Sequence, residues 1–275
     1  MGVYAVTGTA SGMGAATAAR LAAAGHTVIG VDLKDAPIIA DIGTAGGRAH
    51  AAREILAASG GALDGAAAIA GVGPSLKSSA DLVSINYFGQ VALLDALRPA
   101  LAEGGAGRAV VIGSNSASTV PLVDTSLVDL CLAGDEAGAR ERADEGQAAM
   151  PPEILDYAPS IGAYASAKLA LAHWARRTAV TPEWARQGVT LNVIAPGAVL
   201  TPLMTGSTGG AADQDPDEFP TPMPLGRFGQ ADDIAFWVEQ FLKPEAGFAT
   251  GAVLYVDGGT DAAMRPDAQP TAWVL

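Results

Sequence analysis

Tyr164 and Lys168 are the residues whose chemistry and spacing first suggest a reaction. They lie four positions apart in a segment with helical periodicity that begins at Ala163, so both side chains share one face of a helix. A phenol with an ordinary pKa near 10 is a poor acid or base at neutral pH. Lowering that pKa to about 7 requires roughly 4 kcal/mol of preferential stabilisation of the phenolate, to which a nearby ammonium contributes. The same spacing also fits an ordinary pair on a helix surface, so other features must distinguish the two interpretations.

Ser114 and Asn86 are two further polar candidates. Ser114 follows a strand predicted at Val110–Gly113, and Asn86 interrupts the apolar pattern of a helix predicted at Ser79–Leu101. Serines at the end of a strand are ordinary turn chemistry. An amide inside an apolar helix either bonds to the helix backbone or serves a site, and the local sequence leaves both readings open.

A glycine-rich turn joins the first predicted strand, Val3–Val6, to an alanine-rich helix at Ala15–Ala24, with glycines at positions 8, 12 and 14. Glycine lets the backbone approach a ligand closely, and the start of a helix offers unpaired N–H groups to a pyrophosphate. The turn therefore predicts a dinucleotide site, and a positively charged nicotinamide ring would add to the stabilisation of a Tyr164 phenolate. The spacing G-x-x-x-G-x-G differs from the fingerprint G-x-G-x-x-G, so the match rests on mechanism, and a tight turn without a ligand is the alternative.

Two aspartates follow the next predicted strands. Asp32 closes the strand Thr27–Val31, where a carboxylate accepts hydrogen bonds from ribose hydroxyls and repels a 2′-phosphate. This position favours NAD(H) over NADP(H), and Lys34 is interpreted as a solvated loop lysine. Asp41 closes the strand Ile38–Ala40 and could bond to the adenine edge or cap a helix that begins near Thr44.

Two later turns also suit a ligand. The strand Ala66–Ala70 runs into Gly71-Val72-Gly73-Pro74, and the strand Leu191–Ile194 is followed by Pro196 and Gly197. In open α/β sheets, ligands bind outside the carboxyl ends of the strands. The second turn would lie over a nicotinamide ring, where Thr201 could bond to the carboxamide.

Strands and helices alternate along most of the chain, which is typical of a parallel sheet covered by helices on both faces. We expect one α/β domain at residues 1–264, a doubly wound, Rossmann-like parallel sheet of about seven strands, followed by a tail at 265–275. Two segments break the alternation: an acidic insertion of one or two short helices at about 118–162, and a substrate loop or lid at about 200–228. The most polar part of that loop is 203–224.

The composition limits the classes of partner. The 275-residue chain is 49% hydrophobic and has a net charge of −13, so it can build a large core and repels nucleic acid and anionic lipid surfaces. One cysteine, Cys131, and three scattered histidines offer no metal-binding cluster. No leader segment and no apolar run of spanning length is apparent. We expect a cytoplasmic protein without a metal, a nucleic-acid partner or a membrane span.

In their order along the chain, these motifs resemble the short-chain dehydrogenase/reductase family over residues 1 to about 260. Three stretches are also similar to a bacterial subgroup, the 3α-hydroxysteroid dehydrogenases/carbonyl reductases, which carries an insertion before the catalytic tyrosine. These stretches are Ala24–Ile42, Ala70–Pro74 and Val83–Gly89. The family motifs are T-G-x-x-x-G-x-G at Thr7–Gly14, Asp32, Asn86, Ser114, Y-x-x-x-K at Tyr164–Lys168 and P-G-x-x-x-T at Pro196–Thr201.

The resemblance implies a role for each catalytic candidate. Tyr164 would exchange a proton with the substrate oxygen, Lys168 would lower the pKa of Tyr164 and hold the nicotinamide ribose, and Ser114 would orient the carbonyl. Asn86 would hold its helix open for a water in the proton relay. The implied coenzyme is NAD(H), bound by Gly8, Ser11, Gly12, Met13, Gly14, Asp32, Leu33, Asp41, Ile42, Ala70, Gly71, Tyr164, Lys168, Pro196, Gly197, Val199 and Thr201.

The chain departs from the family pattern in two places. Ile69-Ala70-Gly71 stands where the family has N-N-A-G, which removes two amides that normally brace the sheet. Ser114 and Tyr164 lie 50 positions apart, farther than is usual, so Ser116 is the alternative serine. The insertion would lie beside the two helices through which many members form tetramers, and we therefore expect a dimer that uses the other face.

Three functions follow from these features. The first is an NAD(H)-dependent oxidoreductase that interconverts a secondary alcohol and a ketone on a bulky apolar substrate such as a 3-hydroxy- or 3-ketosteroid. The apolar content of Pro121–Leu132 and Leu200–Phe228 suits such a pocket. The second is a reductase of small aliphatic or aryl ketones or of 3-oxoacyl thioesters. The third is a catalytically silent nucleotide sensor, which the intact Ser114, Tyr164 and Lys168 set disfavours.

Overall fold

A parallel seven-stranded sheet forms the centre of the computed structural model, which describes residues 1–204 and 215–270. The strand order is β3-β2-β1-β4-β5-β6-β9, so the chain leaves β1 in one direction and returns on its other side with β4. This order confirms the expected doubly wound α/β fold. The strands are β1 (Val3–Thr7), β2 (Thr27–Asp32), β3 (Ile38–Ile39), β4 (Gly65–Ala68), β5 (Arg108–Ile112), β6 (Thr190–Pro196) and β9 (Val253–Val256).

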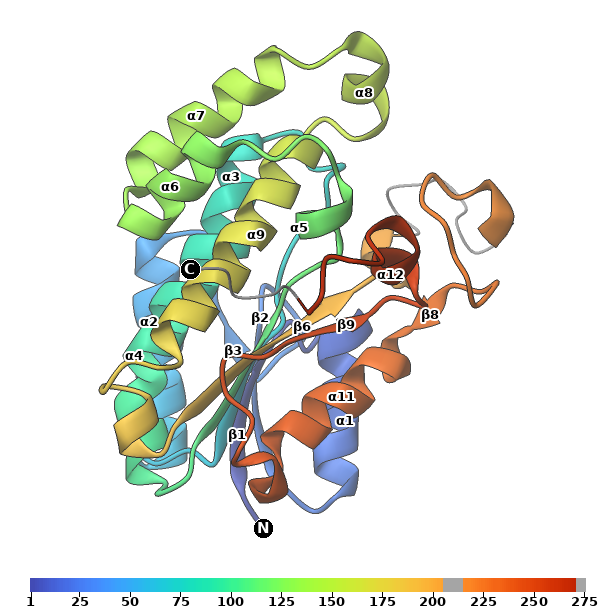
Figure 1. Ribbon diagram of the computed structural model, residues 1–275. Helices are drawn as coiled ribbons and strands as arrows, with labels where there is room; N and C mark the ends of the chain where they lie inside the picture. The colour runs from blue at the N-terminus through green and yellow to red at the C-terminus, as the bar shows by residue number, and fades with distance from the viewer. Residues whose placement is uncertain (205–214, 271–275) are drawn as a thin grey trace, which may run out of the picture.

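Helices cover both faces of the sheet (Figure 1). On one face, α1 (Gly12–Ala23) packs against α11 (Ala231–Leu242) and buries Leu21, Ile234 and Val238 over the sheet. The other face carries α2 (Ala45–Ser59), α4 (Gln90–Glu103) and α9 (Ile161–Thr178). The strand residues alternate between these two layers, so that Ala5 joins one hydrophobic cluster while Tyr4 and Val6 join the other.

The helix predicted at Ser79–Leu101 is interrupted. It consists of α3 (Ser79–Val83), a π-helical segment η1 (Ser84–Gly89) and α4. A π-helical segment changes the register of a helix by closing wider hydrogen-bonded rings, and such segments are frequent at functional sites. Asn86 lies inside η1.

The acidic insertion holds more helices than the one or two that we expected. It contains α5 (Ser116–Thr119), α6 (Thr125–Ala133), α7 (Glu136–Ala148) and α8 (Pro152–Tyr157). Two of its acidic residues start helices: Asp124 accepts hydrogen bonds from Ser126 and Leu127 N–H, and Asp135 accepts one from Gly138 N–H.

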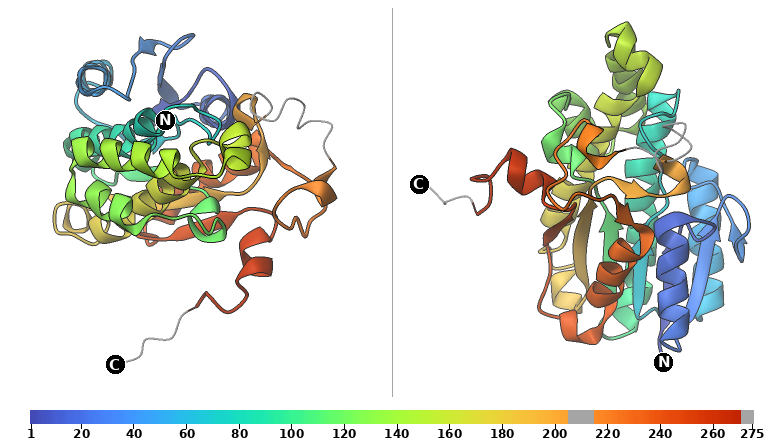
Figure 2. Two further views of the ribbon diagram at one scale, coloured as in Figure 1. Left: turned by 90° about the horizontal axis from the view of Figure 1, so that it is seen from above. Right: turned by 90° about the vertical axis from the view of Figure 1, so that its right-hand side faces the viewer.

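The insertion packs closely on the rest of the domain. Both α6 and α7 contact α9, and α7 also contacts α3; the view from above in Figure 2 shows α6 and α7 beside α9. Leu127, Val128, Cys131, Ala139 and Ala143 are buried there. The apolar residues of α6 therefore belong to the core.

The remaining elements are short. A two-stranded parallel pair, β7 (Val199–Leu200) and β8 (Gly229–Gln230), precedes α11, and α12 (Thr260–Met264) is the last helix of the described residues. Short 3-10 turns lie at Ala185–Gln187, Pro216–Glu218 and Pro244–Ala246. Part of the expected loop at 203–224 and the last residues of the expected tail, 205–214 and 271–275, lie outside the described residues.

Among the described residues, no helix is both long and apolar enough to cross a membrane. Residues 1–204 and 215–270 likewise contain no group of three or more His, Cys, Asp or Glu side chains placed to hold a metal ion.

Candidate functional site

A cavity of about 670 Å³ opens at the carboxyl ends of β1, β2, β4, β5 and β6, as expected for a doubly wound sheet. Almost all of the residues that the sequence suggested for a site line this one cavity. They are Gly8, Ser11, Gly12, Met13, Gly14, Asp32, Leu33, Asp41, Ile42, Ala70, Gly71, Ser114, Ser116, Tyr164, Lys168, Pro196, Gly197, Val199 and Thr201. Asn86 is the exception.

The glycine-rich turn between β1 and α1 forms the floor of the cavity. Gly8 and Gly12 have φ angles of 78° and 55°, which glycine adopts without strain. A Cβ on Gly14 would overlap the carbonyl oxygen of Gly8. Ser11, at the N-cap of α1, makes no side-chain cap bond. The turn is therefore a backbone surface that larger residues would fill, beside the start of a helix, and it suits a pyrophosphate.

Thr7 braces the sheet where the two family amides are missing. Its hydroxyl accepts hydrogen bonds from Ile69 N–H and Ala70 N–H, both at 2.9 Å. Gln90 adds a bond from its side-chain amide to the Ala70 carbonyl, at 3.2 Å. Thr7 belongs to the family motif at Thr7–Gly14, but the bracing roles of Thr7 and Gln90 were not predicted, because both act through contacts between distant segments.

Asp32 lies at the end of β2 with its carboxylate on the cavity. The carboxylate accepts hydrogen bonds from Ala10 N–H at 2.9 Å and Leu33 N–H at 2.6 Å. These bonds fix its position and leave oxygen lone pairs for hydroxyl donors. Lys34 is exposed, as expected for a solvated loop lysine. The free acceptor positions of the carboxylate fit the hydroxyls of the adenosine ribose of NAD(H).

Asp41 does not cap the following helix. Its carboxylate accepts a hydrogen bond from Gly43 N–H at 2.9 Å, whereas Thr44 is the N-cap of α2 and accepts one from Gly47 N–H at 3.0 Å. The capping interpretation of Asp41 is therefore wrong. Thr44 takes that role because it directly precedes the helix.

Ser114, Tyr164 and Lys168, called the triad below, also line the cavity. Ser114 follows β5, and Tyr164 and Lys168 face the cavity from α9. The Lys168 ammonium donates a 2.7 Å hydrogen bond to the Ile112 carbonyl and lies 5.9 Å from the Tyr164 ring centroid. Ser114 lies beside Tyr164, where its hydroxyl lowers the pKa of the phenol, and that hydroxyl accepts a bond from Ser116 N–H. Ser114 is therefore the serine that meets the tyrosine.

Burial sets the pKa values of this triad. It lowers the pKa of Lys168, whose side chain is 4% exposed, to about 7. It also raises the pKa of Tyr164, against a smaller lowering effect of the Ser114 hydrogen bond. The pKa of Tyr164 is therefore not lowered in the chain without coenzyme, and its lowering by Lys168 together with a positively charged nicotinamide ring stays a prediction. Loss of water is the main cause of both shifts.

Asn86 acts behind the cavity wall. Its side chain accepts a hydrogen bond from Val72 N–H and donates one to the Val72 carbonyl, both at 2.9 Å. A Cβ on Gly71 would lie 2.9 Å from the Asn86 carbonyl oxygen. The amide thus fixes the loop after β4 and bonds to another segment, not to its own helix. Sequence periodicity cannot reveal such a partner.

An apolar region lies beyond the triad, and the insertion supplies part of it. Its lining includes Leu122, Ile154, Ala158, Ile161, Leu203, Met204 and Phe219. The sequence pointed to Pro121–Leu132, but of that stretch only Leu122 lines the cavity, because Leu127, Val128 and Cys131 pack into the core. The contribution of α8 was missed, since its short sequence has no distinctive pattern.

Gly14→Ala tests whether the glycine-rich turn binds the coenzyme. The added Cβ overlaps the Gly8 carbonyl oxygen, so we expect at least about a tenfold loss of NADH affinity and about 1–3 kcal/mol of destabilisation. Fluorescence titration with NADH and urea unfolding measure the two effects. Gly46→Ala is the control, because a Cβ there meets no atom within 4 Å. An alanine variant at Gly14 that binds NADH like the wild type would contradict this view of the turn.

Lys168→Met tests the buried ammonium. Because the pKa of Lys168 is lowered to about 7 in the folded protein, Lys168 binds fewer protons there than in the unfolded chain between about pH 7 and 10. Within this range, the burial of Lys168 therefore destabilises the protein most at pH 7 and less as the pH rises. We expect the Tm of Lys168→Met minus that of the wild type to fall by several degrees from pH 7 to 10. Loss of the hydrogen bond to the Ile112 carbonyl changes this Tm difference by the same amount at every pH. Lys77→Met, at an exposed position, should show no such trend.

If the difference for Lys168→Met does not change with pH, then the pKa of Lys168 is not lowered. Calorimetry at four or five pH values is sufficient, because each variant is compared with the wild type in the same buffer.

Comparison with known proteins agrees with this geometry. A family model described as enoyl-(acyl carrier protein) reductase matches residues 154–261. The chain is 38% identical to the 3-alpha-hydroxysteroid dehydrogenase/carbonyl reductase of Comamonas testosteroni, over 97% of this chain and 99% of that protein. It is 32% identical to the short-chain reductase protein NovJ of Streptomyces niveus, over 92% of each.

A solved structure is similar over nearly the whole fold. The crystal structure of the 3-alpha-hydroxysteroid dehydrogenase from Pseudomonas sp. B-0831, complexed with NADH, aligns with a TM-score of 0.84 and 43% sequence identity. The alignment covers 96% of this chain and 99% of that one. The extent of these similarities, together with the sheet order and the cavity, leads to one conclusion: the chain belongs to the short-chain dehydrogenase/reductase family.

Proposed function

We propose that this protein is an NAD(H)-dependent oxidoreductase that interconverts a secondary alcohol and a ketone on a bulky apolar substrate such as a 3-hydroxy- or 3-ketosteroid. The observation that carries the proposal is the position of Ser114, Tyr164 and Lys168 on one wall of the cavity that also contains the glycine turn. The apolar region beside the triad supports an apolar substrate. The names of the Comamonas and Pseudomonas relatives support a steroid.

In this proposal, the triad binds the substrate oxygen and transfers a proton to or from it. The hydroxyls of Ser114 and Tyr164 bond to a ketone oxygen, and Tyr164 transfers its phenolic proton to that oxygen during reduction. In the reverse direction, Tyr164 takes the proton from the alcohol. Lys168, 5.9 Å from the tyrosine ring, is the neighbouring group that titrates near neutral pH. The bound nicotinamide coenzyme supplies or accepts the hydride.

The coenzyme contacts divide into two halves. Asp32, Leu33, Asp41 and Ile42 would hold the adenosine, and the carboxylate of Asp32 would exclude a 2′-phosphate. The turn at Gly8–Gly14 would hold the pyrophosphate. Ala70, Gly71, Tyr164 and Lys168 would position the nicotinamide riboside, and Pro196, Gly197, Val199 and Thr201 would cover the nicotinamide. Asn86 would support this half by fixing Val72.

The substrate lid would comprise residues 200–228, of which Thr201, Leu203, Met204 and Phe219 line the cavity. The insertion at 118–162 would form the facing wall through α8. Both segments would belong to a single domain at 1–264, and we place the protein in the cytoplasm.

The experiment follows NADH and NADPH absorbance separately while the protein meets 3-ketosteroids, aryl ketones, short aliphatic ketones and a 3-oxoacyl thioester. We expect turnover of ketosteroids with NADH, and a loss of at least about a hundredfold in kcat in Tyr164→Phe. Tyr255→Phe, on β9, is the matched control.

The other outcomes separate the alternatives. Turnover with NADPH alone would overturn the role of Asp32, and turnover of small ketones or the thioester alone would replace the steroid. NADH binding without turnover of any substrate would favour the nucleotide sensor.

For the assembly we propose a homodimer through α11 and β9. The insertion covers part of α9, while β9 is an edge strand and α11 exposes Phe236 and Trp237 at 40% and 39%. Light scattering should give twice the 27.5 kDa chain mass, and Trp237→Glu should yield monomers. Phe248→Glu, at a fully exposed position outside α11, is the control. A tetrameric mass would contradict the proposal.

A further inference from the structure

The insertion is attached to the coenzyme side of the domain by one polar face of α7. Four side chains spaced along that face contact the segment 77–84 or Arg48 of α2. Arg140 donates to the Ser84 hydroxyl at 2.7 Å and the Ala80 carbonyl at 3.2 Å. Asp144 and Gln147 accept from Ala80 N–H and Ser79 N–H at the start of α3, and Glu136 pairs with Arg48.

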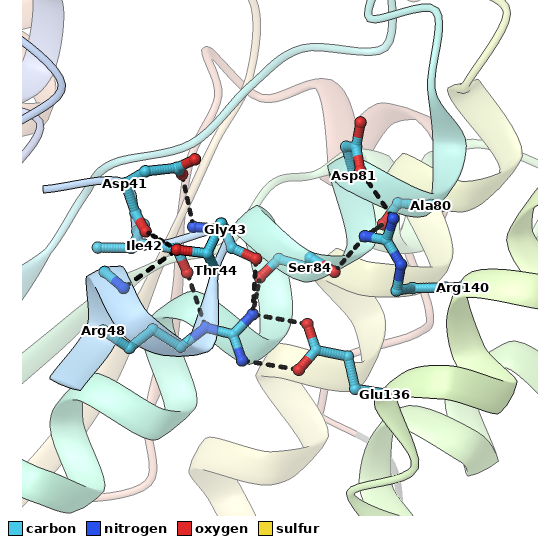
Figure 3. Close-up of polar contacts among 11 residues, drawn as sticks. Asp41, Ile42, Gly43, Thr44, Arg48, Ala80, Asp81, Ser84, Glu136 and Arg140 are labelled. Carbon is cyan, nitrogen blue, oxygen red and sulfur yellow. Dashed lines mark hydrogen bonds and ion pairs between the residues drawn. The ribbon is translucent and has the colours of Figure 1, made fainter.

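Arg48 is the buried centre of these contacts. It is 8% exposed on α2, and its guanidinium donates to the Ile42 carbonyl at 2.7 Å, the Gly43 carbonyl at 3.0 Å and the Ser84 carbonyl at 3.3 Å. Its outer edge forms a bidentate pair with the Glu136 carboxylate at 2.7 and 2.6 Å. Figure 3 shows the guanidinium between the loop at Asp41–Thr44, Ser84 and Glu136. One side chain thus joins three segments.

The loop that Arg48 holds is part of the cavity wall. Asp41 and Ile42 line the cavity on the side of Asp32. The loop is packed tightly from behind, because a Cβ on Gly47 would overlap the Asp41 carbonyl oxygen and one on Gly89 would lie 2.8 Å from the Ile42 carbonyl oxygen. A shift of Arg48 would therefore move the backbone that faces the adenosine position.

Arg48 and Glu136 depend on each other electrostatically. A buried guanidinium without a counter-charge is costly, and the bidentate carboxylate supplies both the charge and the acceptors. The hydrogen bond from Arg48 is the main cause that lowers the pKa of Glu136, with a smaller contribution from Ser84, against the effect of burial. Glu136 therefore stays ionised at neutral pH.

We propose that Arg48 and Glu136 are positioning residues for the adenosine half of the coenzyme, so that the insertion helix α7 and coenzyme affinity are coupled. Glu136 holds the Arg48 guanidinium, and the guanidinium holds the Ile42 and Gly43 carbonyls at the adenosine wall. Coupling is reciprocal, so a ligand at the adenosine position stabilises α7. This inference rests on the proposed NAD(H) function and adds to it a role for the insertion outside the substrate pocket.

Glu136→Gln tests the coupling while keeping the size of the side chain and one acceptor. Calorimetric titration with ADP-ribose, which lacks the nicotinamide, should show the Kd raised about tenfold. The KM for NADH should rise by a similar factor, while kcat at saturating NADH and the KM for the ketone stay within about twofold. A merely structural defect would not raise the KM for NADH while leaving kcat and the KM for the ketone nearly unchanged.

Hydrogen exchange supplies a readout without turnover. In the wild type, ADP-ribose should slow exchange of the α7 amides, and Glu136→Gln should lose most of that protection. Glu145→Gln is the matched control on the same helix, because Glu145 pairs with Arg142 of α7 and is 58% exposed. It should leave the Kd for ADP-ribose and the protection unchanged.

Unchanged ADP-ribose affinity in Glu136→Gln would overturn the inference and leave the proposed function intact. An equal loss in Glu145→Gln would also overturn it, since general loosening of the insertion would then be the cause. A wild-type protein that binds neither ADP-ribose nor NADH would overturn the proposed function and this inference together. Arg48→Lys, which keeps the charge but loses the bidentate geometry, should resemble Glu136→Gln.

Discussion

The hydrogen bond between the buried Lys168 ammonium and the Ile112 carbonyl links α9 to the sheet at the site. It ties the helix to the carboxyl end of β5, and this places Tyr164, one turn earlier, against Ser114 on the next loop. The cost of this arrangement is desolvation, which brings the pKa of Lys168 to about 7. A lysine that is poised between its charged and neutral forms at neutral pH suits a site where protons are exchanged.

The insertion contacts the cavity in two places, at its apolar region and behind the loop at Asp41–Thr44. Ile154 of α8 and Ala158 just after it line the apolar region, while α7 reaches the loop at Asp41–Thr44 through the ion pair of Glu136 with Arg48. Apolar residues of α6 meanwhile pack against α9. In the proposed enzyme, a segment that interrupts the family pattern would therefore influence both substrate choice and coenzyme affinity.

Features that depend on local sequence could be predicted, and features that depend on packing could not. Residues close together in the chain were enough to predict the glycine turn, the doubly wound parallel sheet and the placement of Tyr164 and Lys168 on one helix face. The contact of Arg48 with Glu136 spans 88 positions, and the bracing of Ala70 by Thr7 spans 63. The effect of burial on the Tyr164 pKa could not be predicted for a related reason, because sequence reveals the charges near a group but not how much water reaches it.

Direct hydride transfer at this site is the central claim, and isotope transfer tests it most directly. The measurement is reduction of a 3-ketosteroid with each of the two C4-deuterated isomers of NADH, followed by mass spectrometry of the alcohol. A carbonyl held by Ser114 and Tyr164 meets the coenzyme from one side only, so we expect deuterium at the carbinol carbon from one isomer and none from the other. Alcohol without deuterium from both isomers would contradict direct transfer, and equal labelling from both would contradict a substrate held on one face.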